Sequence, residues 1–493
     1  MPGMRNADPR RLEKTMTATH RSPYGGTWYP GDPAELGDLL ERLSGNSVAR
    51  TGEFLLPGGA AFVVPHAGLV YSGTVALAAY RHLEQQPPET VVILGFAHRG
   101  SRPGIWIPEV DQISTPLGNV AIDRSLGNRL LESQAFQRAP EAQLCDHSVE
   151  IQLPLIQKVA PKARVLPLYA GSMDSRTRRR AAEALAPLIG NGTVLVASSD
   201  LTHYGRDFRF QPFPADSHTA EHLRELDTSV MNAAGSLDAP FFLSTLEETG
   251  ATVCGGSPIS LLLETLSLTQ GEEFFQEILD YQTSGEITGE VHHSVSYGAL
   301  GYFPAPAFHL DRAEQRLLLG SARGTLERYQ KTGKRLRVPP EGRTPALMRK
   351  AAAFVSLHRR GELRGCVGHR AAFQPLFDAI PELTLSAAID DSRFEAVAGD
   401  EQDIDIEISV LSPMKRIASP GLFQVGRHGA YLESGARRGL LLPQVAQSMG
   451  WTAEQFLAGL ARKAGVSPRC YQDSSTRLFV FQAQVFGEHP VIS

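Results

Sequence analysis

The sequence predicts an α/β first half followed by an α+β second half. Between Gly58 and Tyr302, short β-branched apolar runs alternate with helical patterns, which is typical of a mostly parallel sheet with helices on both faces. Residues 304–310, which begin Pro-Ala-Pro-Ala-Phe, indicate a linker. Beyond them, short strands stand among few helices, so a largely antiparallel sheet is expected. A length of 493 residues agrees with two or three domains, and we place them at 21–303 and 311–493.

Each expected element rests on a local pattern. Runs of Val, Ile and Leu predict strands in the first half, and stretches with helical periodicity predict helices. These strands are expected at 60–64, 90–94, 164–168, 193–197 and 294–303, and these helices at 74–83 and 178–188. In the second half, Asp311 is a suitable N-cap for a helix that extends to Gln330. The other elements expected there are strands at 353–358, 405–411 and 477–484 and a helix at 453–463.

Composition excludes several classes of protein. With 42% hydrophobic and 20% charged residues and a net charge of −5, the chain is neither a general nucleic-acid binder nor a membrane protein. No apolar run approaches the roughly 18 residues of a membrane helix. Residues 1–20 are polar and basic and are expected to form a disordered tail without a secretory signal. The four cysteines form no CxxC pair, which favours a reducing, cytoplasmic location.

Four apolar, strand-like runs stop at a histidine or cysteine next to glycine or close to it. These residues are His66, His98, His203 and Cys254. Taken singly, a histidine at a strand end is more often a hydrogen-bonded structural residue. Open α/β sheets, however, bind ligands outside the carboxyl ends of their strands, so the four could converge on one metal ion. Imidazole and thiolate suit Fe, Zn and Cu. Residue types leave the third ligand open among Cys254, Asp200, His203 and His147.

The segment Asp146-His-Ser-Val-Glu150 supports two interpretations. His147 and Glu150 could face the pocket and position a substrate or transfer a proton. Alternatively, Asp146 is the N-cap of a helix and Glu150 lies near the positive end of its dipole. Both interpretations can hold together.

The first half resembles the Memo family, protein B of the AmmeMemoRadiSam system. The matching stretches occur in the family's order: 26–30 (GTWYP), 65–73 (PHAGLVYSG), 93–98 (ILGFAH), 146–154 (DHSVEIQLP), 198–205 (SSDLTHYG), 252–259 (TVCGGSPI) and 294–297 (SVSY). This family shares its fold with the class III extradiol dioxygenases, which use non-haem Fe(II). The resemblance therefore implies a dioxygenase-like fold and Fe(II), with Zn or Cu as alternatives.

The same resemblance implies roles for individual residues. His66, His98 and Cys254 would be the metal ligands. Asp200 and His203 would lie beside the metal, with His203 in the place of the acid–base histidine. A thiolate thus replaces the carboxylate of the dioxygenases, which changes the preferred metal and its redox potential. Arg99 stands where we expect another histidine, and it either favours an anionic substrate or is a solvated loop residue.

The second half resembles the AMMECR1 family, protein A of the same system. The resemblance rests on the stretches 363–368 (LRGCVG), 391–394 (DSRF), 407–413 (EISVLSP), 439–446 (GLLLPQVA) and 450–451 (GW). A tight glycine-rich turn that exposes Cys366 near Arg364 could create a nucleophile or bind a substrate or partner. The alternative is a turn in which a small buried cysteine fills a gap.

One stretch of the second half is strongly basic. Between Arg323 and Lys350 there are nine Lys or Arg residues and only two acids. Such a patch could hold RNA, a phosphorylated cofactor or an acidic partner, although no nucleic-acid motif accompanies it.

Taken together, these observations predict a metal-dependent enzyme of redox or oxygenase-like chemistry acting on a small molecule. The alternatives are a zinc-dependent hydrolase and a non-enzymatic scaffold. The system's name implies a radical S-adenosylmethionine protein as a partner, because this chain lacks the CxxxCxxC cluster motif.

Overall fold

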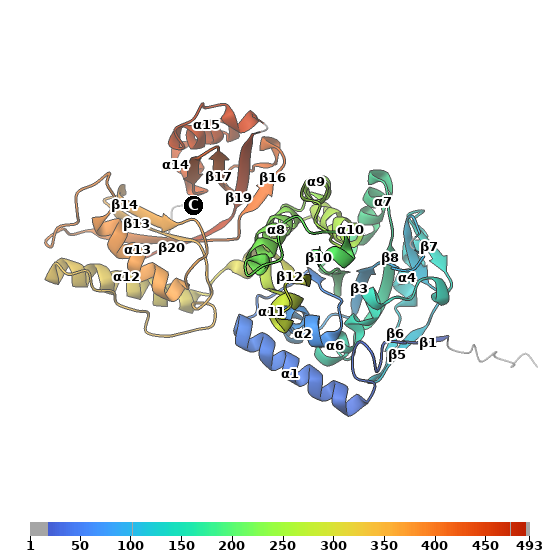
Figure 1. Ribbon diagram of the computed structural model, residues 1–493. Coiled ribbons are helices and arrows are strands. Elements are labelled where there is room, and N and C mark those ends of the chain that lie inside the picture. Colours follow the sequence, from blue (N-terminus) through green and yellow to red (C-terminus); the bar gives the residue numbers. More distant parts are fainter. Residues whose placement is uncertain (1–17, 101, 474, 490–493) are drawn as a thin grey trace, which may run out of the picture.

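The first half is built on a nine-stranded mixed sheet (Figure 1). The computed structural model describes residues 18–100, 102–473 and 475–489. The strand order is β10-β12-β2-β9-β3-β8-β4-β7, and β11 also pairs with β12. The strands are β2 (Ala61–Val64), β3 (Thr90–Gly95), β4 (Ile105–Pro108), β7 (Phe136–Ala139), β8 (Arg164–Ala170), β9 (Thr193–Ser198), β10 (His203–Gly205), β11 (Phe274–Thr283) and β12 (His293–Pro304).

The predicted parallel pairing is found in the centre of this sheet. Strands β2, β9, β3 and β8 are all parallel neighbours. The prediction was wrong for the flanks, where β12 pairs antiparallel with β2 and β4 pairs antiparallel with β8. The described residues between β3 and β4 include no helix, and a parallel return requires a longer crossover than this loop provides.

Helices cover the sheet on both faces. Figure 1 shows α1, α2 and α6 on one side and α7, α9 and α10 on the other. Helix α2 contacts β2, β11 and β12, whereas α10 contacts β9, β3 and β8. The helices of this half are α1 (Pro33–Thr51), α2 (Leu69–Tyr80), α3 (His82–Gln85), α4 (Arg124–Leu131), α5 (His147–Glu150), α6 (Gln152–Val159), α7 (Ser175–Leu185), α8 (Thr219–Ala234), α9 (Ala239–Thr249), α10 (Gly256–Leu268) and α11 (Ser284–Thr288).

A small second sheet corrects the predicted tail. Residues 1–17 lie outside the described part of the chain. The last residues of the predicted tail, however, belong to β1 (Thr19–Arg21), which pairs in parallel with β5 (Gln112–Thr115). β5 in turn pairs with β6 (Gly118–Ala121). His20 in β1 also bonds to the fully buried Glu150, so this part of the chain is anchored.

The second half contains two four-stranded antiparallel sheets, as predicted for an α+β domain. The residues predicted as a linker include the turn η4 (Ala305–Phe308), in which Phe308 is buried. Asp311 caps α12 with a capping box, as the sequence predicted. The sheets are β14-β13-β15-β20 and β16-β19-β17-β18. Their strands are β13 (Ala353–Arg359), β14 (Glu362–His369), β15 (Ile404–Leu411), β16 (Lys415–Ile417), β17 (Gly429–Ser434), β18 (Arg437–Leu441), β19 (Thr476–Phe481) and β20 (Ala483–Gly487), and the helices are α12 (Arg312–Thr332), α13 (Leu376–Ile389), α14 (Gln444–Met449) and α15 (Ala453–Lys463).

The expectation of one strand at 477–484 was wrong. The chain leaves one sheet after Phe481 and enters the other at Ala483. Between them, the Gln482 backbone N–H donates to Ser412 Oγ, and its side-chain amide donates to Glu273. These contacts interrupt the strand pairing at Gln482, between the end of β19 and the start of β20, so the single apolar run at 477–484 contributes one strand to each sheet.

The two halves touch through a partly buried polar cluster. Glu273, next to β11, accepts hydrogen bonds from Lys415 and from His428 at 2.8 Å. Arg416 lies over the Phe241 ring at 3.9 Å from the ring centroid. Among the described residues, no helix is both long enough and apolar enough to cross a bilayer.

Candidate metal centre

His66 stands where the buried strand β2 ends. Its backbone N–H donates to Asp200 Oδ1 at 2.8 Å. Its Nδ1 shares a hydrogen bond of 3.0 Å with Ser198 Oγ, which also accepts from the side-chain amide of Gln152. These contacts fix the ring and turn Nε2 towards Cys254. That nitrogen lies 3.2 Å from the Sγ atom of Cys254.

His98 follows β3 and is held by Asp146. Its backbone N–H donates to Oδ2 at 3.0 Å, and its Nδ1 pairs with Oδ1 at 2.8 Å. A carboxylate that accepts Nδ1–H leaves Nε2 available, as in many metal-ligating histidines. The His98 side chain is 31% exposed, so the centre opens to solvent on this side.

Cys254 precedes α10 and lies against the end of β9. The Asp200 backbone N–H donates to its Sγ at 3.2 Å. Gly255 allows this approach, since a Cβ atom there would lie 2.4 Å from Ser199 Cβ and 2.8 Å from the Ser198 carbonyl oxygen. The glycine that follows the cysteine therefore has a steric purpose.

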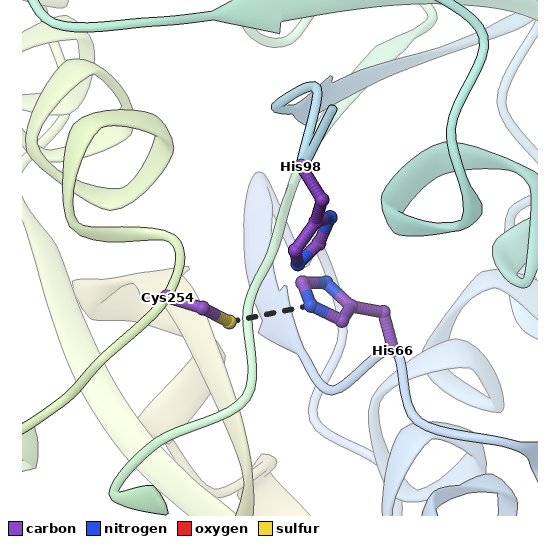
Figure 2. Close-up of side chains that lie close together, drawn as sticks. All are labelled: His66, His98 and Cys254. Atoms are coloured by element: carbon purple, nitrogen blue, oxygen red, sulfur yellow. Dashed lines mark hydrogen bonds between the residues drawn. The ribbon is translucent and has the colours of Figure 1, made fainter. Parts of the chain in front are cut away.

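The three side chains converge on one point (Figure 2). One donor atom each from His66, His98 and Cys254 lie within 4.8 Å of one another. Nitrogen and sulfur ligands of one tetrahedral ion would be about 3.5 Å apart, close to the 3.2 Å between His66 and Cys254. Three protein donors with one side open are typical of a catalytic rather than a structural site. The residues present therefore fit a metal ion.

The electrostatics favour a neutral His66 imidazole, and the Cys254 thiolate needs a nearby cation. Burial and the neighbouring histidines lower the pKa of His66 well below its usual value. Burial, followed by the charge of Asp200, raises the pKa of the Cys254 thiol. A bound metal would replace the thiol proton, so metal binding is coupled to proton release.

His147 lies beside this centre, as one of its two interpretations required. Its ring stacks on His98 with centroids 3.9 Å apart, and burial lowers its pKa to about 4. The helix interpretation of this segment also holds, because Asp146 caps α5 by accepting the Ser148 N–H. Glu150 bonds instead to His20.

Asp200 and His203 lie close enough for their charges to interact electrostatically. Burial raises the pKa of Asp200 to about 6, and the charge of His203 opposes this shift. His203 Nδ1 is within hydrogen-bond distance of two carbonyl oxygens, those of Leu201 and Thr252. Because carbonyls only accept, Nδ1 carries the hydrogen and Nε2 is free to exchange a proton.

Comparison with known proteins decides the family. The family model described as Memo-like protein matches residues 21–301. The chain belongs to the Memo family. The AMMECR1 model matches residues 319–486, so a Memo domain is fused to an AMMECR1 domain in one chain.

Individual relatives match each part. The MEMO1 family protein MK0963 of Methanopyrus kandleri is 31% identical over 294 residues, which are 57% of this chain and 98% of that protein. The memo-1 homolog of Caenorhabditis elegans is 29% identical over 310 residues, 60% of this chain and 84% of its own. The crystal structure of PH0010 from Pyrococcus horikoshii has a TM-score of 0.34 and 38% identity, and it covers 35% of this chain and 91% of its own.

Sequence reasoning missed the aromatic surroundings of the Memo site. The Trp28 ring lies 4.4 Å from the His147 ring, and Tyr24 contacts both. Trp28 belongs to the GTWYP stretch, which was a signal without an assigned role. Arg99 is exposed, and its charge helps to lower the pKa of His147. The rim therefore combines aromatic faces with one cation.

In the AMMECR1 domain, the polar side chains of the glycine-rich LRGCVG signature are hydrogen-bonded to residues of the same domain. Arg364 donates to both carboxylate oxygens of Glu401, at 2.7 and 3.0 Å, and to the Glu395 carbonyl. The Cys366 thiol accepts from Ser356 Oγ at 3.2 Å, and burial raises its pKa. These contacts favour the structural interpretation over a reactive thiol. The predicted turn was wrong, because residues 363–368 lie within strand β14, where Cys366 pairs with Ser356 of β13.

The basic stretch of the same domain is partly neutralised. Four of its cations pair with carboxylates: Arg323 with Glu488, Lys331 with Glu327, Arg335 with Asp390 and Arg337 with Glu382. This pairing reduces the positive charge available to an RNA or an acidic partner.

Proposed function

We propose that His66, His98 and Cys254 hold one Fe(II) ion and that the Memo domain uses it in a redox or oxygenase-like reaction on a small molecule. The supporting observation is the convergence of the three donor atoms within 4.8 Å. When bound, the ion supplies one-electron redox chemistry at an open coordination position. Zn and Cu are the alternative metals for the same donors.

The chain's own residues prepare the site for this role. Ser198 and Asp146 orient the two imidazoles through Nδ1, so Nε2 of each faces the centre. His203 Nε2, with Asp200 beside it, is placed to hold or move a proton in the reaction. Neutral His147 and the Trp28 ring cover one side of the site and limit the access of water.

Metal analysis of anaerobically purified protein tests this proposal. We expect about one iron per chain, a paramagnetic signal when nitric oxide is added, and loss of iron in His66→Ala and Cys254→Ser. His293→Ala is the matched control, because its side chain is half exposed and lies outside the donor set. Zinc in place of iron would move the proposal to a hydrolase that uses a metal-bound water. If the purified protein contains no metal and His66→Ala changes none of its properties, the non-enzymatic scaffold is the remaining function.

We further propose that the AMMECR1 domain presents the substrate or a partner, and that the partner is a radical S-adenosylmethionine protein in the cytoplasm. The fusion keeps both domains at a ratio of one to one and at high effective concentration. All four cysteines are free, as a reducing compartment requires. Co-purification of a candidate partner with the full chain, and its loss on deleting either domain, tests this arrangement.

A further inference from the structure

A second group of metal-ligating side chains joins separate segments of the Memo domain. His20 lies on β1, Cys145 immediately precedes the N-cap of α5, and Glu150 is the last residue of that helix. One donor atom from each lies within 4.8 Å of the other two. None of the three belongs to the centre formed by His66, His98 and Cys254.

Glu150 is a fully buried carboxylate that is only half satisfied. Its side chain is 0% exposed, and its Oε1 pairs with His20 Nε2 at 3.0 Å. Its Oε2 is buried without any hydrogen-bond partner in the described structure. A buried charged oxygen without a partner is costly, and a cation would satisfy it.

His20 is oriented as a ligand would be. Its ring is largely buried, with 14% of the side chain exposed. The other ring nitrogen, Nδ1, lies 3.9 Å from Glu141 Oε1. This distance is too long for a hydrogen bond, so Glu141 adds negative charge beside the second nitrogen without fixing the tautomer.

Cys145 completes a set of one nitrogen, one sulfur and one oxygen donor. It is partly buried and forms no disulfide. Burial, and then the charges of Glu150 and Glu141, raise the pKa of its thiol. The negative field that disfavours a thiolate would attract a divalent cation.

We propose that His20, Cys145 and Glu150 form a second metal site that binds Zn²⁺. Imidazole, thiolate and carboxylate are the ligands that zinc takes in proteins, and a water molecule would complete a tetrahedron. The ion would tie β1 to α5, the helix that carries His147. Its role is therefore to hold the N-terminal strand and one wall of the first centre in place.

Cobalt and zinc binding to full-length Cys254→Ser protein test the proposal without the first centre's thiolate. Co²⁺ should give a thiolate-to-metal charge-transfer band, and Zn²⁺ should displace it. The band should be lost in Cys254→Ser/Cys145→Ser and kept in Cys254→Ser/Cys366→Ser, the matched control. Glu150→Gln in the Cys254→Ser background should abolish tight zinc binding, whereas Glu141→Gln, which removes only a nearby charge, should weaken it much less.

Two outcomes would overturn the proposal. One is the absence of a cobalt–thiolate band in folded Cys254→Ser protein, which would mean that a water molecule alone satisfies Glu150. The other is a band that survives Cys145→Ser.

Two further measurements keep the test decisive if Cys145→Ser does not fold. Cys145→Asp should retain zinc but lose the band. In Cys254→Ser protein, Zn²⁺ should slow alkylation of Cys145 but not of Cys366. Unprotected Cys145 would contradict the proposal. Iron loss at the first centre is read separately, so the two proposals fail independently.

Discussion

The metal centre of the Memo domain and the LRGCVG signature of the AMMECR1 domain share one kind of hydrogen bond, but the side chains it positions have different roles. In both, an aspartate accepts the backbone N–H of the central residue: Asp146 from His98 at 3.0 Å and Asp391 from Cys366 at 2.8 Å. In the Memo domain the support leaves a nitrogen free to face the other donors. In the AMMECR1 domain, Asp391 also accepts a hydrogen bond from Arg393, and the Cys366 thiol accepts one from Ser356.

The comparison teaches that a glycine-flanked histidine or cysteine is not a site by itself. What distinguishes the Memo centre is that three metal-ligating atoms, from His66, His98 and Cys254, meet within 4.8 Å of one another. In the signature, each polar group is paired within its own domain. Glycine serves packing in both places, since it lets one backbone approach another.

The largest effect is expected from a matched pair of glycine substitutions. A Cβ at Gly365 would lie 2.2 Å from the Ala387 carbonyl oxygen, where helix α13 cannot easily move. Gly365→Ala should destabilise the protein by about 3 kcal/mol or more, without changing metal content. Gly255→Ala should lower stability and metal content together. Denaturant unfolding measures the stability of each variant, and metal analysis measures its metal content. Metal loss in Gly365→Ala would contradict the proposed difference between the two sites.

A pair of aspartate substitutions comes next. Asp146→Asn removes the carboxylate that orients His98, so metal affinity should fall about 10- to 100-fold, or about 1.4–2.8 kcal/mol. Asp391→Asn is the matched control, because it changes the same backbone support in the other domain. Competition with a chelator measures both affinities. Equal losses in the two variants would show that the effect is one of folding rather than of ligand orientation.

The fold and part of the site could be predicted from the sequence. The apolar runs before His66 and His98 are strands, β2 and β3, and parallel strands end at the same edge of a sheet. The same prediction was wrong for the other two residues, because Cys254 lies in the loop between α9 and α10 and His203 begins β10. The partners of those ligands were not predictable. Whether Ser198 or Gln152 contacts His66 depends on side-chain direction, which a single sequence does not carry. The Trp28 contact with His147 depends on packing between distant segments.

The errors in the fold have similar physical causes. Periodicity detects a strand but not its neighbour, so antiparallel β12 was assigned to a mostly parallel sheet. The run at 477–484 is continuous in hydrophobicity, and only the bonds of Gln482 to Ser412 and Glu273 divide it between two sheets. Glu150 was interpreted as a pocket-facing carboxylate or as a residue near the helix dipole, whereas its partner is His20, which lies in the predicted tail.

A smaller effect separates the two interpretations of Arg364. The Arg364 side chain is 17% exposed and its guanidinium is paired with Glu401, whose side chain is 8% exposed. If the pair is structural, Arg364→Lys and Glu401→Gln should each cost about 1–2 kcal/mol of unfolding free energy, and their effects should not be additive. A double-mutant cycle in urea measures this coupling. Unchanged stability with lost partner binding would restore Arg364 as a recognition residue.

The smallest effect concerns acid stability. The pKa of Asp391 is lowered from 3.8 to about 2, mainly because its carboxylate accepts a hydrogen bond from Arg393. The folded state therefore binds this proton less readily than the unfolded chain, so the carboxylate stabilises the fold above about pH 4 and loses that contribution as the pH falls towards 2. Asp391→Asn should remove about 1–2 kcal/mol near pH 6 and narrow the gap to wild type at pH 2–3. Urea unfolding across this pH range measures the difference, and Asp390→Asn is the neighbouring control. A gap that stays constant with pH would mean that Asp391 acts through geometry rather than charge, and the two aspartate supports would then differ in kind.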